Sequence, residues 1–368
     1  MGLESDELLH LLALTQLPGI GPVTARNAIA YCGSATGVFR HSPGQLQKIP
    51  DVGPKLAHVL GQPPSLARAE KELRFAERTG VRVLTYLEPD FPVLLTTDAS
   101  LPLVVFVKGT LNLRAQPAVA VVGTRKPSDY GRQQALRFAE AFARHGLNVV
   151  SGLAYGIDAT AHKRALEVDG LTTAVLGHGL DRIYPPAHHS LADQIVAQGG
   201  ALLTEFWSGT RPETNNFPAR NRIIAGLSQA TLVVEAAQTG GALITARMAF
   251  ELNREVFAVP GSLDQPSFAG CNRLIQTQVA KLVTQPEDVF AELNLEPAAQ
   301  PLPVAKATLS AAELAIWQRL PPNEGIHLDA LALAVGLPVA ELVARLLELE
   351  FRGWVRQLPG RRFAQVQP

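Results

Sequence analysis

The chain has 368 residues, of which 47% are hydrophobic and 18% are charged, so it is long and apolar enough for two or three domains with their own cores. Basic and acidic residues number 33 each, which excludes a strong overall positive field, so local clusters must decide whether a nucleic acid binds. The two cysteines exclude a disulfide framework, and the acidic start and the lack of a long apolar run favour a cytoplasmic protein without a membrane partner.

Residues 1–80 show a helical pattern that contains a short internal repeat. The segments Leu17–Pro22 and Ile49–Pro54 share one six-residue pattern: an apolar residue, proline, any residue, an apolar residue, glycine and proline. A helical pattern follows each segment. This spacing is typical of the turns in a helix-hairpin-helix or SAM-like domain, whose backbone N–H groups can hold a phosphate. Only the second turn has a basic neighbour, Lys55, so helix packing or a protein contact is favoured over DNA contact here.

Between residues 81 and 293, apolar runs rich in β-branched residues alternate with helical patterns. Each run ends in glycine or another small residue, as the strands of a parallel α/β sheet do. We therefore predict an α/β domain with a doubly wound sheet, and the ligand site of such a sheet lies at the carboxyl ends of its strands. The predicted strands are Val119–Val122, Val149–Val150, Thr173–Leu176, Thr231–Val234 and Val256–Val259.

The first of these strands is followed by Gly123, Thr124 and Arg125, and a helix is expected from about Tyr130 to Arg144. The glycine permits close approach of a ligand to the backbone, and the start of the helix offers free N–H groups. Arg125 adds a positive charge at the same place. The pattern predicts an anion site, although a tight strand-to-helix turn that needs glycine for steric reasons alone explains it equally well.

A second anion-type pattern lies in Phe217–Ser228, where Phe217, Pro218, Arg220 and Arg222 open a helical segment. Two arginines without partners are costly in a core, whereas at a helix N-terminus they strengthen a site for anions. Phe217 is placed to stack on a base or a sugar. The alternative is a helix with Pro218 at its first position, two solvated arginines and Phe217 packed as a staple.

Residues 294–307 are rich in proline and predict an extended linker, and residues 308–368 predict a winged helix. Ser310 and Glu313 have capping-box spacing, two more helices are expected near 328–335 and 338–350, and a hairpin covers 354–366. The third helix is acidic, whereas the hairpin side is basic, so DNA contact would come from the wing. A protein-interaction module explains the domain equally well. The basic residues are Arg352, Arg356, Arg361 and Arg362.

With these motifs laid out, the chain resembles the DNA-processing protein A family (DprA, also called Smf) from about Leu8 to Gln365. The resemblance implies an extended Rossmann-like central domain that binds single-stranded DNA, loads RecA recombinase during natural transformation, forms a homodimer and needs no cofactor. The motifs that carry it are Val122–Arg125, Ser151–Asp158 with His162, Gly177–Pro185, Phe217–Ser228, Pro260–Ser262 and Gly270–Ile275. Departures around Thr239–Thr245, His188 and Gln276–Ala280 leave the fine shape of the pocket and the dimer surface open.

The predicted DNA site combines backbone and hydroxyl donors, positive charges and one stacking ring. The donors are Gly123, Thr124, Ser151, Gly152, Asn221 and Gly240, the charges are Arg125, Arg220 and Arg222 with Lys163 and Arg211 at the rim, and the ring is Phe217. For the dimer, the apolar segment Cys271–Val283 is the candidate, and simple burial against the sheet is its alternative. The predicted dimer residues are Leu274, Ile275 and Leu282.

The other function considered is that of a nucleotide-binding enzyme similar to the phosphoribohydrolases on the same fold. Their signature needs an acid shortly after a glycine-rich turn, but no carboxylate follows Gly240 and Gly241 before Glu251, and Glu235 precedes the turn. Asp158 and His162 have the spacing of a local helical pair rather than of a catalytic dyad. Since His188 and His189 lack a third ligand, a metal site is not expected either. We therefore predict a protein that is not an enzyme.

Overall fold

The computed structural model describes residues 5–111, 117–295, 309–321, 325–351, 354–358 and 360–365. The chain divides into two compact units, Met1–Ala298 and Ala299–Pro368. The predicted boundaries at residues 80 and 293 stay predictions, and most of the predicted linker lies outside the described residues. Among the described residues no single helix is long and apolar enough to cross a membrane. One bent pair of helices, Leu328–Val335 with Val339–Glu350, has the length and composition for a span and no other sign of one.

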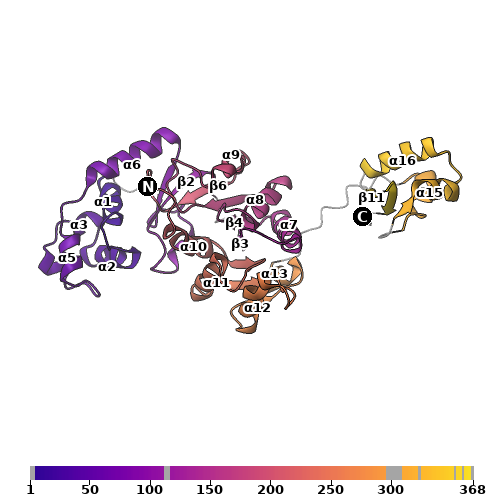
Figure 1. Ribbon diagram of the computed structural model, residues 1–368. Helices are drawn as coiled ribbons and strands as arrows, with labels where there is room; N and C mark the ends of the chain where they lie inside the picture. The colour runs from indigo at the N-terminus through magenta and orange to yellow at the C-terminus, as the bar shows by residue number, and fades with distance from the viewer. Residues whose placement is uncertain are drawn as a thin grey trace. The chain divides into compact units, whose positions relative to one another are not determined.

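The first unit begins with a bundle of helices that carries the predicted repeat (Figure 1). Gly21 and Gly53 are the N-cap residues of α2 and α5, and each helix starts with the proline that follows, so the tandem hairpin turns are confirmed. Trp207 and Phe106 of the central domain belong to the same apolar core as this bundle. The helices are α1 (Ser5–Thr15), α2 (Pro22–Cys32), α3 (Ala35–Val38), α4 (Pro43–Leu46), α5 (Pro54–Leu60) and α6 (Leu66–Thr79).

The central sheet has nine strands in the order β1-β2-β6-β5-β4-β3-β7-β8-β9. All pairs from β6 to β9 are parallel, whereas β1, β2 and β6 pair antiparallel. The chain winds outward in both directions from the β3–β7 pair, which confirms the doubly wound, extended Rossmann-like fold. The strands are β1 (Arg82–Thr85), β2 (Val104–Gly109), β3 (Ala118–Val122), β4 (Asn148–Ser151), β5 (Thr172–Val175), β6 (Ala201–Thr204), β7 (Ala230–Val233), β8 (Glu255–Ala258) and β9 (Lys281–Leu282).

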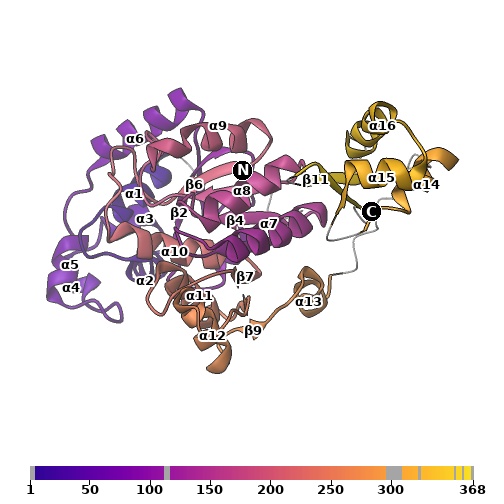
Figure 2. The same cartoon turned by 45° about the vertical axis from the view of Figure 1, so that its right-hand side comes forward.

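Helices cover both faces of this sheet (Figure 2). Val119 and Val121 of β3 pack into the core under α7 and α8, while Ala120 and Val122 pack into the core under α10 and α11, as the alternation along a strand requires. The helices are α7 (Asp129–Arg144), α8 (Ile157–Glu167), α9 (His189–Ala197), α10 (Asn216–Leu227), α11 (Gly241–Glu251), α12 (Ala269–Gln276) and α13 (Pro286–Glu292), with 3-10 turns at Val93–Thr96, Pro186–His188 and Pro266–Phe268.

The second unit is a winged helix, as predicted, with a three-stranded sheet in the order β10-β12-β11. The capping box of Ser310 and Glu313 is present at the start of α14. Arg356, Arg361 and Arg362 are exposed on the hairpin, whereas Arg352 lies outside the described residues. The elements are α14 (Ala311–Trp317), β10 (Ile326–His327), α15 (Leu328–Val335), α16 (Val339–Phe351), β11 (Val355–Leu358) and β12 (Arg362–Gln365).

Candidate nucleic-acid interface

A cleft of about 440 Å³ opens at the carboxyl ends of β3 and β7, where the winding of the sheet reverses. Open α/β sheets bind their ligands at this place because the loops on the two sides diverge there. The lining residues come from the loop after β3, the first turn of α10 and the glycine-rich start of α11. Among them are Gly123, Thr124, Arg125, Lys126, Asp158, Phe217, Arg220, Asn221, Thr239, Gly240 and Gly241.

The loop after β3 is held from below by Glu235, which is fully buried. Its carboxylate accepts hydrogen bonds from the main-chain N–H and the hydroxyl of Ser128, both at 2.9 Å, and its carbonyl accepts one from Thr124 N at 2.8 Å. Gly123 is required beneath the loop, because a Cβ there would lie 2.5 Å from Ile157. These contacts occupy Glu235, and the Thr124 N–H predicted to face the ligand is used internally.

Arg125 and Lys126 stand exposed at the outer end of this loop. In the described part of the chain neither residue forms an ion pair, so both charges are available to a phosphate. The guanidinium of Arg125 lies 5.6 Å from the centre of the half-buried Phe217 ring. The structure thus brings the predicted charge and the predicted stacking ring together from residues almost one hundred positions apart. Lys126 was not singled out from the sequence, although it directly follows Arg125.

The start of α11 closes the other side of the cleft. Gly240 is its N-cap residue in an extended conformation, and nothing lies within 4 Å of where its Cβ would be. Asn221 lines the same cleft and donates from its amide to the carbonyl of Gly241 at 3.3 Å. The first N–H groups of a helix have no partner within the helix, so this end of the cleft suits an anion.

Arg220 has a different place from the one we predicted, since it is only 5% exposed. α10 begins at Asn216, so Arg220 follows the first turn, and its side chain is buried where it lines the cleft. Its guanidinium donates to the carbonyl of Gly152 at 2.7 Å and makes a short hydrogen bond to the carbonyl of Val175. Arg220 therefore ties α10 to the ends of β4 and β5, and the prediction of an unpartnered arginine is wrong.

Asp158 compensates the buried charge of Arg220. Its carboxylate accepts from the N–H groups of Gly152 at 3.1 Å and Ala154 at 3.3 Å, so the Gly152 N–H is also occupied. Burial raises the pKa of Asp158, and the attraction of Arg220 opposes that shift. Burial likewise lowers the pKa of Arg220 to about 10, with Asp158 opposing, which leaves the guanidinium charged at neutral pH.

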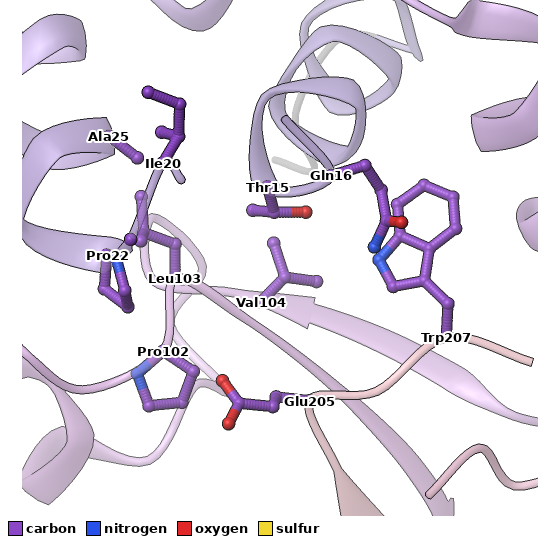
Figure 3. A pocket seen from close by; sticks show the side chains of 11 residues that line it. Thr15, Gln16, Ile20, Pro22, Ala25, Pro102, Leu103, Val104, Glu205 and Trp207 are labelled. Carbon is purple, nitrogen blue, oxygen red and sulfur yellow. The ribbon is translucent and has the colours of Figure 1, made fainter. Parts of the chain in front are cut away.

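Arg222 faces away from the cleft and forms a short ion pair with Glu205. Glu205 follows β6 and lines a separate cavity of about 170 Å³ between the helical bundle and the sheet, together with Trp207 and Gln16 (Figure 3). Burial raises the pKa of Glu205, and Arg222 opposes the shift. The expectation that Arg220 and Arg222 share one pocket was wrong. Two residues that are two positions apart in a helix lie on different sides of it.

Besides Gly152 and Arg222, three predicted residues do not line the cleft. Ser151 is buried and its hydroxyl donates to the carbonyl of Val121 at 2.6 Å. Lys163 on α8 and Arg211 in the loop before α10 are exposed but lie outside the lining set. His162 does not pair with Asp158 as predicted, because its Nδ1 lies 2.6 Å from the hydroxyl of Thr172.

The three predicted dimer residues differ in exposure. Leu274 is 4% exposed and belongs to the core of its own chain, so its side chain is not free for a partner. Ile275 is half-buried, and Leu282 is 50% exposed on the two-residue edge strand β9. In the described segments no group of three or more His, Cys, Asp or Glu side chains is arranged to hold a metal ion.

Three family models match this chain. The model for DNA recombination-mediator protein A covers residues 82–294, the DprA winged helix domain covers residues 300–361, and a SAM-like helix-hairpin-helix tandem covers residues 11–60. These three matches follow the order of the helical bundle, the central sheet and the winged helix.

Similar proteins cover nearly the whole chain. Protein Smf of Synechocystis sp. is 34% identical over 98% of this chain and 99% of its own length. The X-ray structure of DNA processing protein A from Streptococcus pneumoniae has a TM-score of 0.65 and 35% identity, over 79% of this chain and 99% of that one. A structure of DNA processing protein A from Helicobacter pylori, described for its single-stranded DNA binding mode, has a TM-score of 0.52 and 28% identity over 58% and 95%. The chain therefore belongs to the DNA recombination-mediator protein A family, also called DprA or Smf, whose members process DNA in recombination.

Proposed function

We propose that this protein binds single-stranded DNA in the cleft between β3 and β7 and, as a homodimer, promotes the loading of RecA recombinase onto it. The observation that carries the DNA proposal is the contact of Arg125 with the face of Phe217 at the edge of an open cleft. A cation and an aromatic ring side by side bind a phosphate and a base of one strand without reading its sequence. The Helicobacter pylori relative, described as binding single-stranded DNA, supports this function.

In this mechanism Arg125 and Lys126 hold the backbone by charge, the first turn of α11 offers N–H groups, and Phe217 stacks on a base. Arg220, Asp158 and Glu235 act by fixing the loops that contact the DNA, because their polar groups are bonded to main-chain groups. Reading through phosphates and stacking makes affinity depend on salt and hardly on sequence.

The test is a salt titration of binding to single-stranded DNA, duplex DNA and a mononucleotide. We expect the tightest binding to the single strand, with affinity falling as salt rises. Equal binding of duplex DNA would contradict the proposal, and turnover of the mononucleotide would support a phosphoribohydrolase instead.

The RecA step goes beyond the family description of a recombination mediator, and with it we propose that the protein works in the cytoplasm beside RecA. Its test is the rate at which RecA filaments form on single-stranded DNA already covered by a single-strand-binding protein. We expect the wild type to shorten the lag and Arg125→Ala to lose that effect. No change of the lag with wild-type protein would refute the loading role while leaving DNA binding untouched.

A further inference from the structure

A second aromatic ring lies beside Phe217 on the side of the sheet edge that follows β5. Tyr184 is 42% exposed, and its ring centre lies 6.1 Å from that of Phe217 with 33° between the planes. This is a normal separation for an aromatic pair. Phe217 in turn lies over Gly177, where a Cβ would be 3.2 Å from the ring. Phe217 therefore contacts both the cation of Arg125 and a second aromatic ring.

The segment that carries Tyr184 is anchored at both ends. Five residues before Tyr184, the N–H of Gly179 donates to the carbonyl of Thr210 at 3.2 Å. Four residues after Tyr184, the Nδ1 atom of His188 lies 2.7 Å from the carbonyl oxygen of Leu153. The main chain on both sides of Tyr184 is thus held before any ligand arrives, and the ring rests against Phe217, which lowers the entropic cost of stacking on it.

The charges around Tyr184 do not oppose a nucleic acid. The nearby carboxylate of Asp181 accepts from Arg182 at 2.7 Å and from Gly209 N at 2.8 Å, so its charge is compensated. Because Arg182 is the partner of Asp181, the two side chains together carry no net charge.

We propose that Tyr184 is a second base-stacking platform, so that the strand runs from Arg125 over Phe217 onto Tyr184 with neighbouring bases on the two rings. This inference rests on the proposed single-stranded DNA binding and adds the direction in which the strand leaves the cleft. Single-strand binders gain affinity from successive rings in this way, because every base has a face to stack.

The experiment measures binding of oligothymidylates to the full chain and its variants, with abasic residues moved along the strand. We expect Tyr184→Ala to weaken binding between about 5-fold and 150-fold, the range that stacking on one base supplies, while Tyr184→Phe and Tyr184→Trp bind like the wild type. Tyr31→Ala, a matched control with 46% exposure on α2, leaves affinity unchanged. An abasic residue placed next to the nucleotide that stacks on Phe217 should weaken binding to the wild type. The same abasic residue should leave the affinity of Tyr184→Ala unchanged.

A double variant separates stacking from support of Phe217. If the two rings hold two bases, Phe217→Ala with Tyr184→Ala binds more weakly than either single variant. If the double variant binds like Phe217→Ala alone, or Tyr184→Ala binds like the wild type, the inference is overturned although the DNA function stands. Failure of wild-type protein to bind any single strand overturns the proposed function itself. Thermal unfolding of each variant confirms that the comparison is between folded proteins.

Discussion

The guanidinium of Arg220 lies directly against the backbone of Gly152, where a Cβ would come within 2.6 Å of a guanidinium nitrogen. The same guanidinium donates to the Gly152 carbonyl, while Asp158 accepts from the Gly152 N–H. One glycine thus lets two buried side chains of opposite charge hold the end of β4, Arg220 through its carbonyl and Asp158 through its N–H. The buried Arg220 and the exposed Arg125 therefore lead to different expectations for stability and for ligand binding.

Removing Arg125 should affect binding and leave folding intact, because its side chain is exposed. We expect Arg125→Ala to weaken binding to every single-stranded sequence and to lower the slope of log affinity against log salt by about 0.7, the share of one phosphate contact. Fluorescence anisotropy across a salt series measures that slope. An unchanged slope in a folded variant would exclude Arg125 from the site.

Removing Arg220 should affect folding first. Arg220→Ala removes the buried guanidinium that donates to the carbonyls of Gly152 and Val175, and leaving a buried acceptor unsatisfied costs about 1–3 kcal/mol of unfolding free energy. Urea unfolding measures the loss. A variant with wild-type stability and lost DNA binding would show that Arg220 contacts the ligand after all.

Gly152→Ala should also destabilise the protein, by about 1–3 kcal/mol, because the new methyl group overlaps the Arg220 guanidinium. The matched control is Gly240→Ala, since Gly240 has an extended backbone and open space around its Cβ position. Thermal unfolding of the pair compares the same chemical change at a filled and an open position. Equal melting temperatures would contradict the packing described for Gly152.

Variants of Phe217 distinguish stacking on a base from packing against the protein. We expect Phe217→Ala to cost about 1–3 kcal/mol of single-strand binding with little change in melting temperature, and Phe217→Trp to retain the affinity, because the half-buried ring lines the cleft. Binding and thermal unfolding are measured on the same preparation. A large fall in melting temperature with binding that tracks the unfolded fraction would make Phe217 a staple.

The buried His162 makes the fold sensitive to acid. Burial lowers the pKa of His162 from 6.5 to about 3, with further lowering by His188 and Arg220. Between pH 6.5 and pH 3 the unfolded chain therefore binds a proton at His162 that the folded chain does not bind. The contribution of neutral His162 to the unfolding free energy is complete above pH 6.5 and is lost as pH falls toward 3. We expect His162→Asn to flatten the pH dependence of the unfolding free energy in that window by up to about 1.4 kcal/mol per pH unit. Parallel slopes for the variant and the wild type would refute this role.

The dimer proposal predicts different effects for charge substitutions at two leucines. Leu282→Glu, on an exposed edge strand, should give a folded monomer with weaker DNA binding because two linked sites add avidity. Leu274→Glu should instead unfold the chain, since it buries a charge in the core. Light scattering with sizing reads the first result and circular dichroism the second. A wild-type protein that runs as a monomer at micromolar concentration would end the proposal.

The sequence predicts the architecture well because the signals for it are local. The helix at Leu328–Val335, the capping box at Ser310 and the strand ends at Val122 and Ser151 each depend on neighbouring residues. The place of Arg125 and Phe217 in the cleft could be predicted for the same reason, because each residue stands beside a turn signal.

The partners of the buried charges are not local. Asp158 lies 62 positions before Arg220 and Glu205 lies 17 positions before Arg222, and only the folded sheet brings them together. A charge pattern on one helix shows that compensation is needed without showing where it comes from. Tyr184 was likewise known as part of a motif, but its proximity to Phe217 follows from the packing of α10 on the end of β5.

The two buried carboxylates decide which main-chain donors of the cleft remain free. Glu235 accepts from the N–H of Ser128, and Asp158 accepts from the N–H groups of Gly152 and Ala154, so these three donors are already satisfied within the protein. A phosphate in the cleft would therefore have to use other groups. In the proposed function these are the exposed side chains of Arg125 and Lys126 and the start of α11, all of which line the outer part of the cleft.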